Sequence, residues 1–154
     1  MTATTPAFDL TVSRVIPAEP QALYAIVTEV GRMGELSPET RSTQWVEGDG
    51  PVVGARFKGR NKLGWLSWTT IATVTEAEPG ARFAFEISPP SRTTWTYTFE
   101  AVPGGTRVTE SMRKDSDQPA PIRLLQRLAG VRDRREHLRA GMTTTLERLE
   151  AASR

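Results

Sequence analysis

The sequence predicts an α+β fold, in which a curved, seven-stranded antiparallel sheet is covered on one face by a long C-terminal helix. Three observations support this prediction. Seven segments have the composition and apolar alternation of strands, and six of them follow one another through short turns, which favours an antiparallel meander. One helical segment separates the first strand from the other six. The apolar spacing becomes helical after residue 118, and only this last segment is long enough to cover a sheet.

The first strand is predicted over residues 8–16, where Leu10 and Val12 are the apolar markers. Pro17 ends it, and a helix is predicted over residues 18–30 because apolar side chains recur there at helical spacing. Two glycines break this helix. Residues 32–39 are therefore expected to form a loop or one further helical turn.

Six more strands follow in series, and the clearest alternation is that of Trp95, Tyr97 and Phe99 against intervening threonines. Their predicted ranges are 41–48, 53–61, 65–79, 81–87, 93–102 and 106–114.

Two tryptophans in the stretch GRNKLGWLSWTT are three residues apart, an odd step on a strand. Odd steps place side chains on opposite faces of a sheet. We therefore expect Trp68 to face the interior and Trp65 to lie on the outer surface or in the turn.

The same alternation places aromatic rings and polar groups together inside the sheet. The expected inward set is Phe57, Asn61, Trp68, Thr70, Phe83, Phe85, Trp95, Tyr97, Phe99 and Glu110. A dry core does not normally include a carboxylate, because an unpaired buried charge is very costly. The mixture predicts an internal cavity.

The C-terminal segment has two apolar stripes. They consist of Ile122, Leu125 and Leu128, then of Leu138, Met142, Leu146 and Leu149. Gly130 and the charged run 132–136 separate them, which predicts a bend or break there.

The totals are typical of one soluble domain spanning residues 1–154, with 38% hydrophobic and 25% charged residues. Cysteine is absent, and the sequence shows neither a signal peptide nor a membrane span, so a cytoplasmic protein is predicted. The formal net charge of +2 does not predict nucleic-acid binding.

Cofactor and metal motifs are missing from the sequence, so neither a cofactor nor a metal is predicted. His137 is the only histidine and is expected at a surface or an interface. No acidic cluster has metal-ligand spacing, no GxSxG accompanies the histidine, and the glycines of GDGPVVG follow no phosphate-binding pattern.

Several motifs together resemble a known family. The succession LSPE, GPVVGARFKGRN, EPGARFAFEI, GGTRVTES and GMTTTLERLE is similar to the polyketide cyclase/dehydrase-like proteins of the START-like (SRPBCC) superfamily, of the type found in actinobacteria. The resemblance runs from about Phe8 to the end of the chain. It implies a helix-grip (START/Bet v 1-like) fold, with the sheet around the terminal helix and a deep apolar cavity between them.

The candidate ligand-binding residues follow from this register and this resemblance. They are Trp45, Phe57, Asn61, Trp68, Phe85, Trp95, Tyr97, Phe99, Glu110, Met112 and Leu125. Ordinary core packing is the alternative for the aromatic rings, and a role in the turn is the alternative for Asn61.

Two carboxylates are candidates for catalysis. Glu110 is expected inside the cavity, unless the register slips by one residue or an arginine pairs with it. Glu39 is expected near the cavity mouth, with helix capping or a pair with Arg41 as the alternative.

The leading hypothesis is a protein, monomeric or homodimeric, that binds a small hydrophobic or aromatic molecule, lipid-like or polyketide-like, in its cavity. Residues 33–39 and the start of the terminal helix are expected to form the gate. One alternative is a polyketide cyclase or dehydratase using Glu110 or Glu39 as acid/base. Another is a regulatory domain whose cavity is filled by its own side chains.

The arginine-rich run 123–139 suits either transient contact with an anionic membrane or a solvated helix face.

Overall fold

The computed structural model describes residues 8–87, 92–114 and 134–154. All seven predicted strands are present and form one antiparallel sheet in the order β1-β7-β6-β5-β4-β3-β2. Their bounds are β1 Phe8–Ile16, β2 Thr40–Glu47, β3 Arg56–Leu63, β4 Leu66–Glu78, β5 Arg82–Ile87, β6 Thr93–Val102 and β7 Gly105–Lys114. The fold class predicted from the sequence is therefore confirmed.

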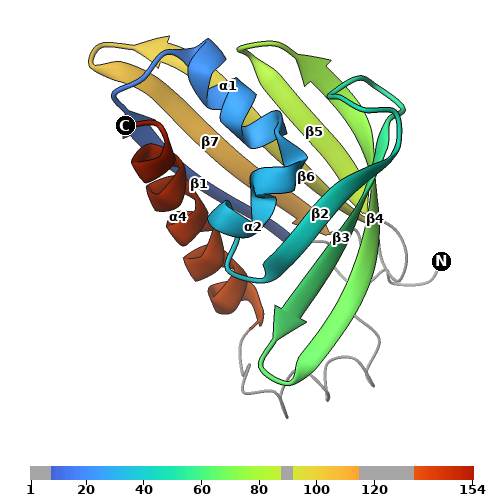
Figure 1. Ribbon diagram of the computed structural model, residues 1–154. Helices are drawn as coiled ribbons and strands as arrows, with labels where there is room; N and C mark the ends of the chain where they lie inside the picture. The colour runs from blue at the N-terminus through green and yellow to red at the C-terminus, as the bar shows by residue number, and fades with distance from the viewer. Residues whose placement is uncertain (1–7, 88–91, 115–133) are drawn as a thin grey trace, which may run out of the picture.

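The helices all lie on one face of the curved sheet (Figure 1). They are α1 Pro20–Thr28, the 3₁₀ turn η1 Val30–Arg32, α2 Met33–Leu36 and α4 Arg134–Ala152. Helix α4 packs mainly along β1, whereas α1 covers parts of β5 and β6. The one further turn expected after the first helix is α2. The stripe of Ile122, Leu125 and Leu128 and the bend expected near Gly130 lie outside the described residues.

The hairpin between β3 and β4 explains the two tryptophans. Leu63 pairs with Leu66, so that Gly64 and Trp65 alone form the turn, and Gly64 has a φ of 61°. A two-residue hairpin turn commonly needs such left-handed backbone, which glycine adopts readily. Trp65 is 60% exposed at the tip, whereas Trp68 pairs with Asn61 on the inner face. Both expectations are confirmed.

The core lies between the inner face of the sheet and the helices. Its fully buried members include Phe83 and Val108 from the sheet and Leu146 and Leu149 from α4. Register shifts in β2 and between Val74 and Glu76 in β4 mark bulges, which increase the local bend and twist of a strand. A curled sheet that its helices cover only in part need not pack solid at every point. Among the described residues, no helix is long and apolar enough to cross a membrane.

The fit of α2 against β2 gives a first testable prediction. A Cβ added at Gly34 would lie 2.8 Å from the backbone oxygen of Arg41, whereas one added at Gly31 meets nothing within 4 Å. Gly34→Ala should lower the free energy of unfolding by about 1–3 kcal/mol, because backbone must move. Gly31→Ala should stay within about 0.5 kcal/mol. Urea denaturation checks both, and equal stabilities for the two variants would contradict the close approach.

Candidate functional site

A cavity of about 640 Å³ lies between the inner face of the sheet and the helices α2 and α4. Its aromatic walls are Phe57, Trp68, Phe85, Trp95 and Tyr97. Each of these rings comes from a strand position of inward parity. The pairings Phe57 with Ala72 and Phe85 with Trp95 show how neighbouring strands deliver side chains to the same face. Met112 of β7 also contributes to the lining.

One end of the cavity is closed by packed rings. Phe57 and Phe85 meet edge to face with centroids 5.0 Å apart, and Phe57 also meets Trp45 in the same way at 5.6 Å. Beyond these rings, α1 fills the space over β5 and β6. The cavity therefore occupies the part of the interior that lies nearer the β3–β4 hairpin.

This packing corrects two predictions of cavity-wall residues. Phe99 is buried, but it packs against Tyr24 of α1, with centroids 5.8 Å apart, and does not line the cavity. Trp45 lies behind Phe57 and borders a different hollow beside α1. Both positions have inward parity, but parity does not tell which inward positions the first helix covers. Leu125 lies outside the described residues.

Asn61 lies within β3 and not in the turn, so the alternative of a turn-forming asparagine is wrong. Its side-chain nitrogen donates to Thr70 Oγ1 over 3.2 Å, and its side-chain oxygen accepts from Thr40 Oγ1 over 3.3 Å. These bonds link β2, β3 and β4 on the cavity wall. Asn61 is thus held in place by the neighbouring strands.

Glu110 is the polar centre of the site. It is 2% exposed, it borders the cavity, and Tyr97 Oη donates to its Oε2 over 2.7 Å. No described residue hydrogen-bonds its other oxygen, Oε1. The one-residue slip is therefore wrong, because Glu110 faces inward, and among the described residues its partner is the phenol of Tyr97 and not an arginine.

Burial controls the protonation of this pair. Removal from water raises the pKa of Glu110 to about 8, and the hydrogen bond from Tyr97 opposes only part of that rise. Burial, together with the nearby carboxyl group, raises the pKa of the Tyr97 phenol well above its ordinary value. At neutral pH most Glu110 side chains are uncharged carboxylic acids. Such a group can donate a hydrogen bond to a ligand or a proton to a substrate.

Glu39 also borders the cavity, as do Met33 and Pro38 of the same segment. Its backbone oxygen accepts the Lys62 N–H over 2.8 Å, which ties this loop to β3. The side chain is half-buried. Glu39 therefore belongs to the cavity wall, and its role there stays a prediction.

Several lining residues were missed by the sequence analysis. Lys114 and Thr43 share the inward parity of Glu110 and Trp45, so the alternation contained the signal for both. Lys114 is buried. His137, expected at a surface, is indeed exposed, yet it borders the cavity from α4. Only the packing of the helix against the sheet reveals that contact.

Metal binding finds no support among the side chains that the structure describes. No group of three or more histidines, cysteines, aspartates or glutamates in that part of the chain is placed to hold a metal ion.

Comparisons with known proteins agree with this architecture. The family model described as polyketide cyclase / dehydrase and lipid transport matches residues 7–154. A search of curated proteins found no match.

Three solved structures show the same fold at low sequence identity. The major latex-like protein 151 of Panax ginseng has a TM-score of 0.73 at 11% identity, covering 96% of this chain and 98% of its own. TTHA0849 of Thermus thermophilus has a TM-score of 0.73 at 20% identity, covering 95% and 97%. CV1439 of Chromobacterium violaceum has a TM-score of 0.69 at 15% identity, covering 93% and 95%.

The buried carboxyl group predicts a pH-dependent stability. The pKa of Glu110 is about 8 in the folded protein against an ordinary value of 4.5, so the folded state holds the proton more tightly. The contribution of the protonated Glu110 side chain to the free energy of unfolding is complete below pH 4.5. It declines as pH rises toward 8, by up to about 1.4 kcal/mol per pH unit. Glu110→Gln should remove this decline and raise the stability relative to wild type at about pH 8.

Urea denaturation at several pH values between about 4.5 and about 8.5 measures this difference. Glu39→Gln is the control, because it removes a less buried carboxylate from the same cavity. Parallel pH profiles for wild type and Glu110→Gln would show that Glu110 is not held as a buried acid.

Proposed function

Because this chain belongs to the polyketide cyclase / dehydrase and lipid transport family, we propose that its cavity binds one small, uncharged hydrophobic or aromatic molecule. The observation that carries the proposal is a cavity of about 640 Å³ with five aromatic rings in its wall. Cavities of roughly 300–1,000 Å³ with mostly apolar walls are typical of small-molecule sites. Flat rings suit flat or apolar guests.

The driving force would be removal of apolar ligand surface from water. That contribution is roughly 25 cal/mol per Å², before the loss of ligand freedom is subtracted. Several polar side chains of the wall are hydrogen-bonded within the protein: Asn61 donates to Thr70, and Tyr97 donates to Glu110. Most of the surface that faces the cavity is nevertheless apolar, so an ionic headgroup would lose its hydration there, and this favours an uncharged guest.

Glu110 is the group that we expect to orient the guest. Tyr97 already donates to Oε2, which leaves Oε1 as the oxygen without a partner among the described residues. As an uncharged acid, Glu110 can donate to a carbonyl or hydroxyl oxygen of the ligand. A ligand with one such oxygen would supply the missing hydrogen-bond partner of Oε1.

The gate proposed at residues 33–39 is supported by where α2 lies. Met33, Leu36 and Glu39 border the cavity from one side, and His137 and Leu138 of α4 border it from the other.

We expect the protein to act as a monomer or homodimer in the cytoplasm, without a cofactor. The alternative of a regulatory domain predicts a cavity filled by side chains, and the open volume counts against it.

Blocking the cavity tests the proposal. Thr93 borders the cavity, whereas its neighbour Thr94 has the opposite parity and does not. Thr93→Trp should weaken binding of the neutral fluorescent probe N-phenyl-1-naphthylamine at least about tenfold, because the indole takes the ligand's space. Thr94→Trp should leave binding unchanged. Equal loss in both variants, or no binding by the wild type, would contradict the proposal.

A cyclase or dehydratase is the second candidate, favoured by the contact of 2.7 Å between Tyr97 and Glu110. An uncharged acid at a cavity wall can protonate a substrate oxygen, and its conjugate base can accept a proton from carbon. Glu110→Gln should then abolish turnover of an aromatic polyketide substrate while probe binding persists. Glu39→Gln is the matched variant, and unchanged turnover in Glu110→Gln would remove Glu110 from the mechanism.

A further inference from the structure

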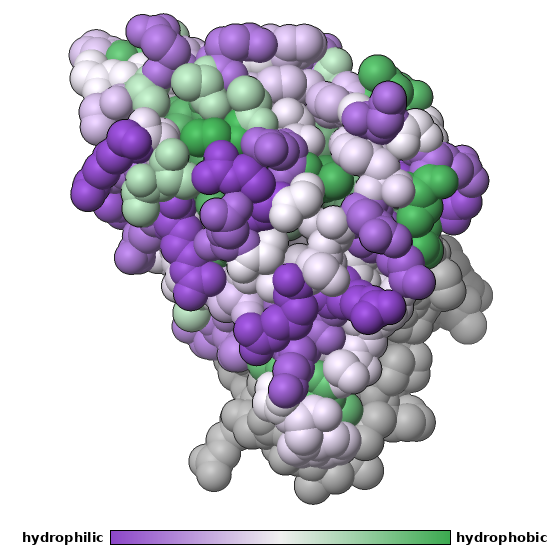
Figure 2. Space-filling view, viewed as in Figure 1, coloured by the Kyte–Doolittle hydropathy of each residue, from purple (hydrophilic) through white to green (hydrophobic). Residues whose placement is uncertain are grey.

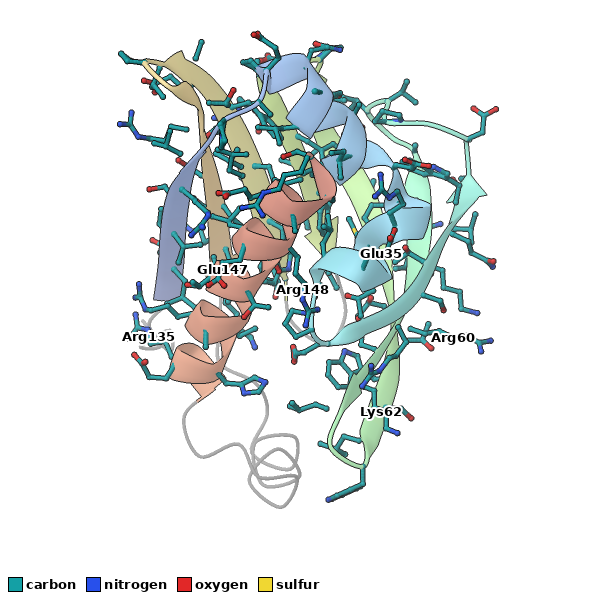
Figure 3. All side chains as sticks on the ribbon, turned by 60° about the vertical axis from the view of Figure 1, so that its left-hand side comes forward. Glu35, Arg60, Lys62, Arg135, Glu147 and Arg148 are labelled. Carbon is teal, nitrogen blue, oxygen red and sulfur yellow. The ribbon has the colours of Figure 1, made fainter. Side chains whose placement is uncertain are left out.

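The outer face of β3 carries a row of positive charges. Lys58, Arg60 and Lys62 alternate with the inward residues of the strand, and Arg60 and Lys62 are exposed while Lys58 is half-buried. Alternate residues on one face of a strand are about 7 Å apart. We use the name basic row for Lys58, Arg60 and Lys62. Figure 3 shows Arg60 and Lys62 along β3, away from Arg135 and Glu147 on α4.

The basic row has no acidic partners among the described residues. Its cross-strand neighbours are neutral: Gln44 and Ser42 on β2, and Ile71, Thr69 and Ser67 on β4. Three other arginines of the sheet do have acidic partners. Arg56 contacts Glu47, Arg82 contacts Glu76 and Arg107 contacts Glu100. Like charges on one strand face repel one another, so a row without counter-charges favours an anionic partner.

Protection of a sheet edge does not explain this row. Lysines that prevent aggregation belong on edge strands, where backbone groups are unpaired. The edges of this sheet are β1 and β2, and β3 is paired on both sides. In Figure 2, strongly hydrophilic residues gather over the part of β2 and β3 that leads to the hairpin.

The row ends at an exposed aromatic ring. Trp65, 60% exposed, forms the tip of the β3–β4 hairpin three residues after Lys62. Tryptophan prefers the headgroup region of a bilayer, and lysine and arginine favour anionic headgroups. Leu66 and Trp68, just after the tip, border the cavity. The same hairpin therefore carries cations, an interfacial ring and part of the cavity wall.

We propose that the outer face of β3 and the hairpin tip at Trp65 form a docking surface for an anionic lipid bilayer. Contact is peripheral and reversible, since three cations and one ring give a modest attraction. Docking brings the hairpin end of the cavity to the headgroups. The surface is distinct from the cavity, so it can be tested whether or not the proposed ligand binds.

Nucleic acid fits this surface less well. Proteins that bind single strands on a sheet combine cations with aromatic rings on which bases stack. The described neighbours of the basic row on that face are serine, threonine, glutamine and isoleucine. Trp65 lies at the tip and not within the face.

Flotation with vesicles tests the proposal. Wild type should bind vesicles of phosphatidylcholine mixed with phosphatidylglycerol, and not vesicles of phosphatidylcholine alone. The triple variant Lys58→Gln, Arg60→Gln, Lys62→Gln should bind roughly 100-fold more weakly, at about fivefold for each cation. The control is a second triple variant, Arg82→Gln, Arg107→Gln, Arg154→Gln, which changes the net charge by the same amount. These three arginines are already paired, with Glu76, Glu100 and Glu150 respectively. It should lose less than about threefold.

Three outcomes would overturn the docking surface. They are no binding of wild type to the mixed vesicles at low salt, equal losses in the two triple variants, and a row-dependent shift of an oligonucleotide without vesicle binding. Adding Trp65→Ser to the basic-row variant should weaken vesicle binding by a further several-fold. If binding does not weaken further, the hairpin tip is not part of the docking surface. Uptake of N-phenyl-1-naphthylamine by the basic-row variant should stay at the wild-type level, which separates a failure of docking from a failure of ligand binding.

Discussion

The antiparallel pairing of all seven strands, from the edge strand β1 to the edge strand β2, is the constraint on which the rest of the structure depends. Outside the bulges in β2 and β4, the period of two assigns each strand residue to one of two faces, and a slip of one residue would exchange them. That register brings Phe57, Trp68, Phe85 and Trp95 together on one face and places Lys58, Arg60 and Lys62 on the other. One strand, β3, therefore supplies both a cavity wall and a charged outer surface.

The inward face encloses a cavity because the helical cover is incomplete. Helix α1 reaches over β5 and β6, and its Tyr24 packs on Phe83 and Phe99. Farther along the strands, α2 is four residues long and α4 packs mainly toward β1. The interior between α2 and α4 is therefore left open, and this open space is the cavity. Glu110 lies in that region, so its carboxyl group is separated from water without an ionic partner among the described residues. The raised pKa of Glu110 follows from this geometry.

Much of this could be predicted from the sequence because alternation is a local property. The seven strands, the inward set and the exposure of Trp65 followed from residue spacing and turn chemistry. Spacing could not show that α1 would cover Phe99 or that Phe57 would separate Trp45 from the cavity, since both depend on how helices seat on the sheet. It also left Lys114 unnoticed, although its parity matches that of Glu110. The contact of His137 with the cavity depends on packing alone, and sequence periodicity carries no signal for it.

The central claim is that the cavity accommodates a guest molecule. Native mass spectrometry of the gently purified protein, followed by solvent extraction, measures this most directly. We expect an added mass near one equivalent that solvent extraction removes, and an extract containing an uncharged apolar compound. A bare protein mass, together with no adduct after incubation with neutral apolar compounds that fit about 640 Å³, would contradict it.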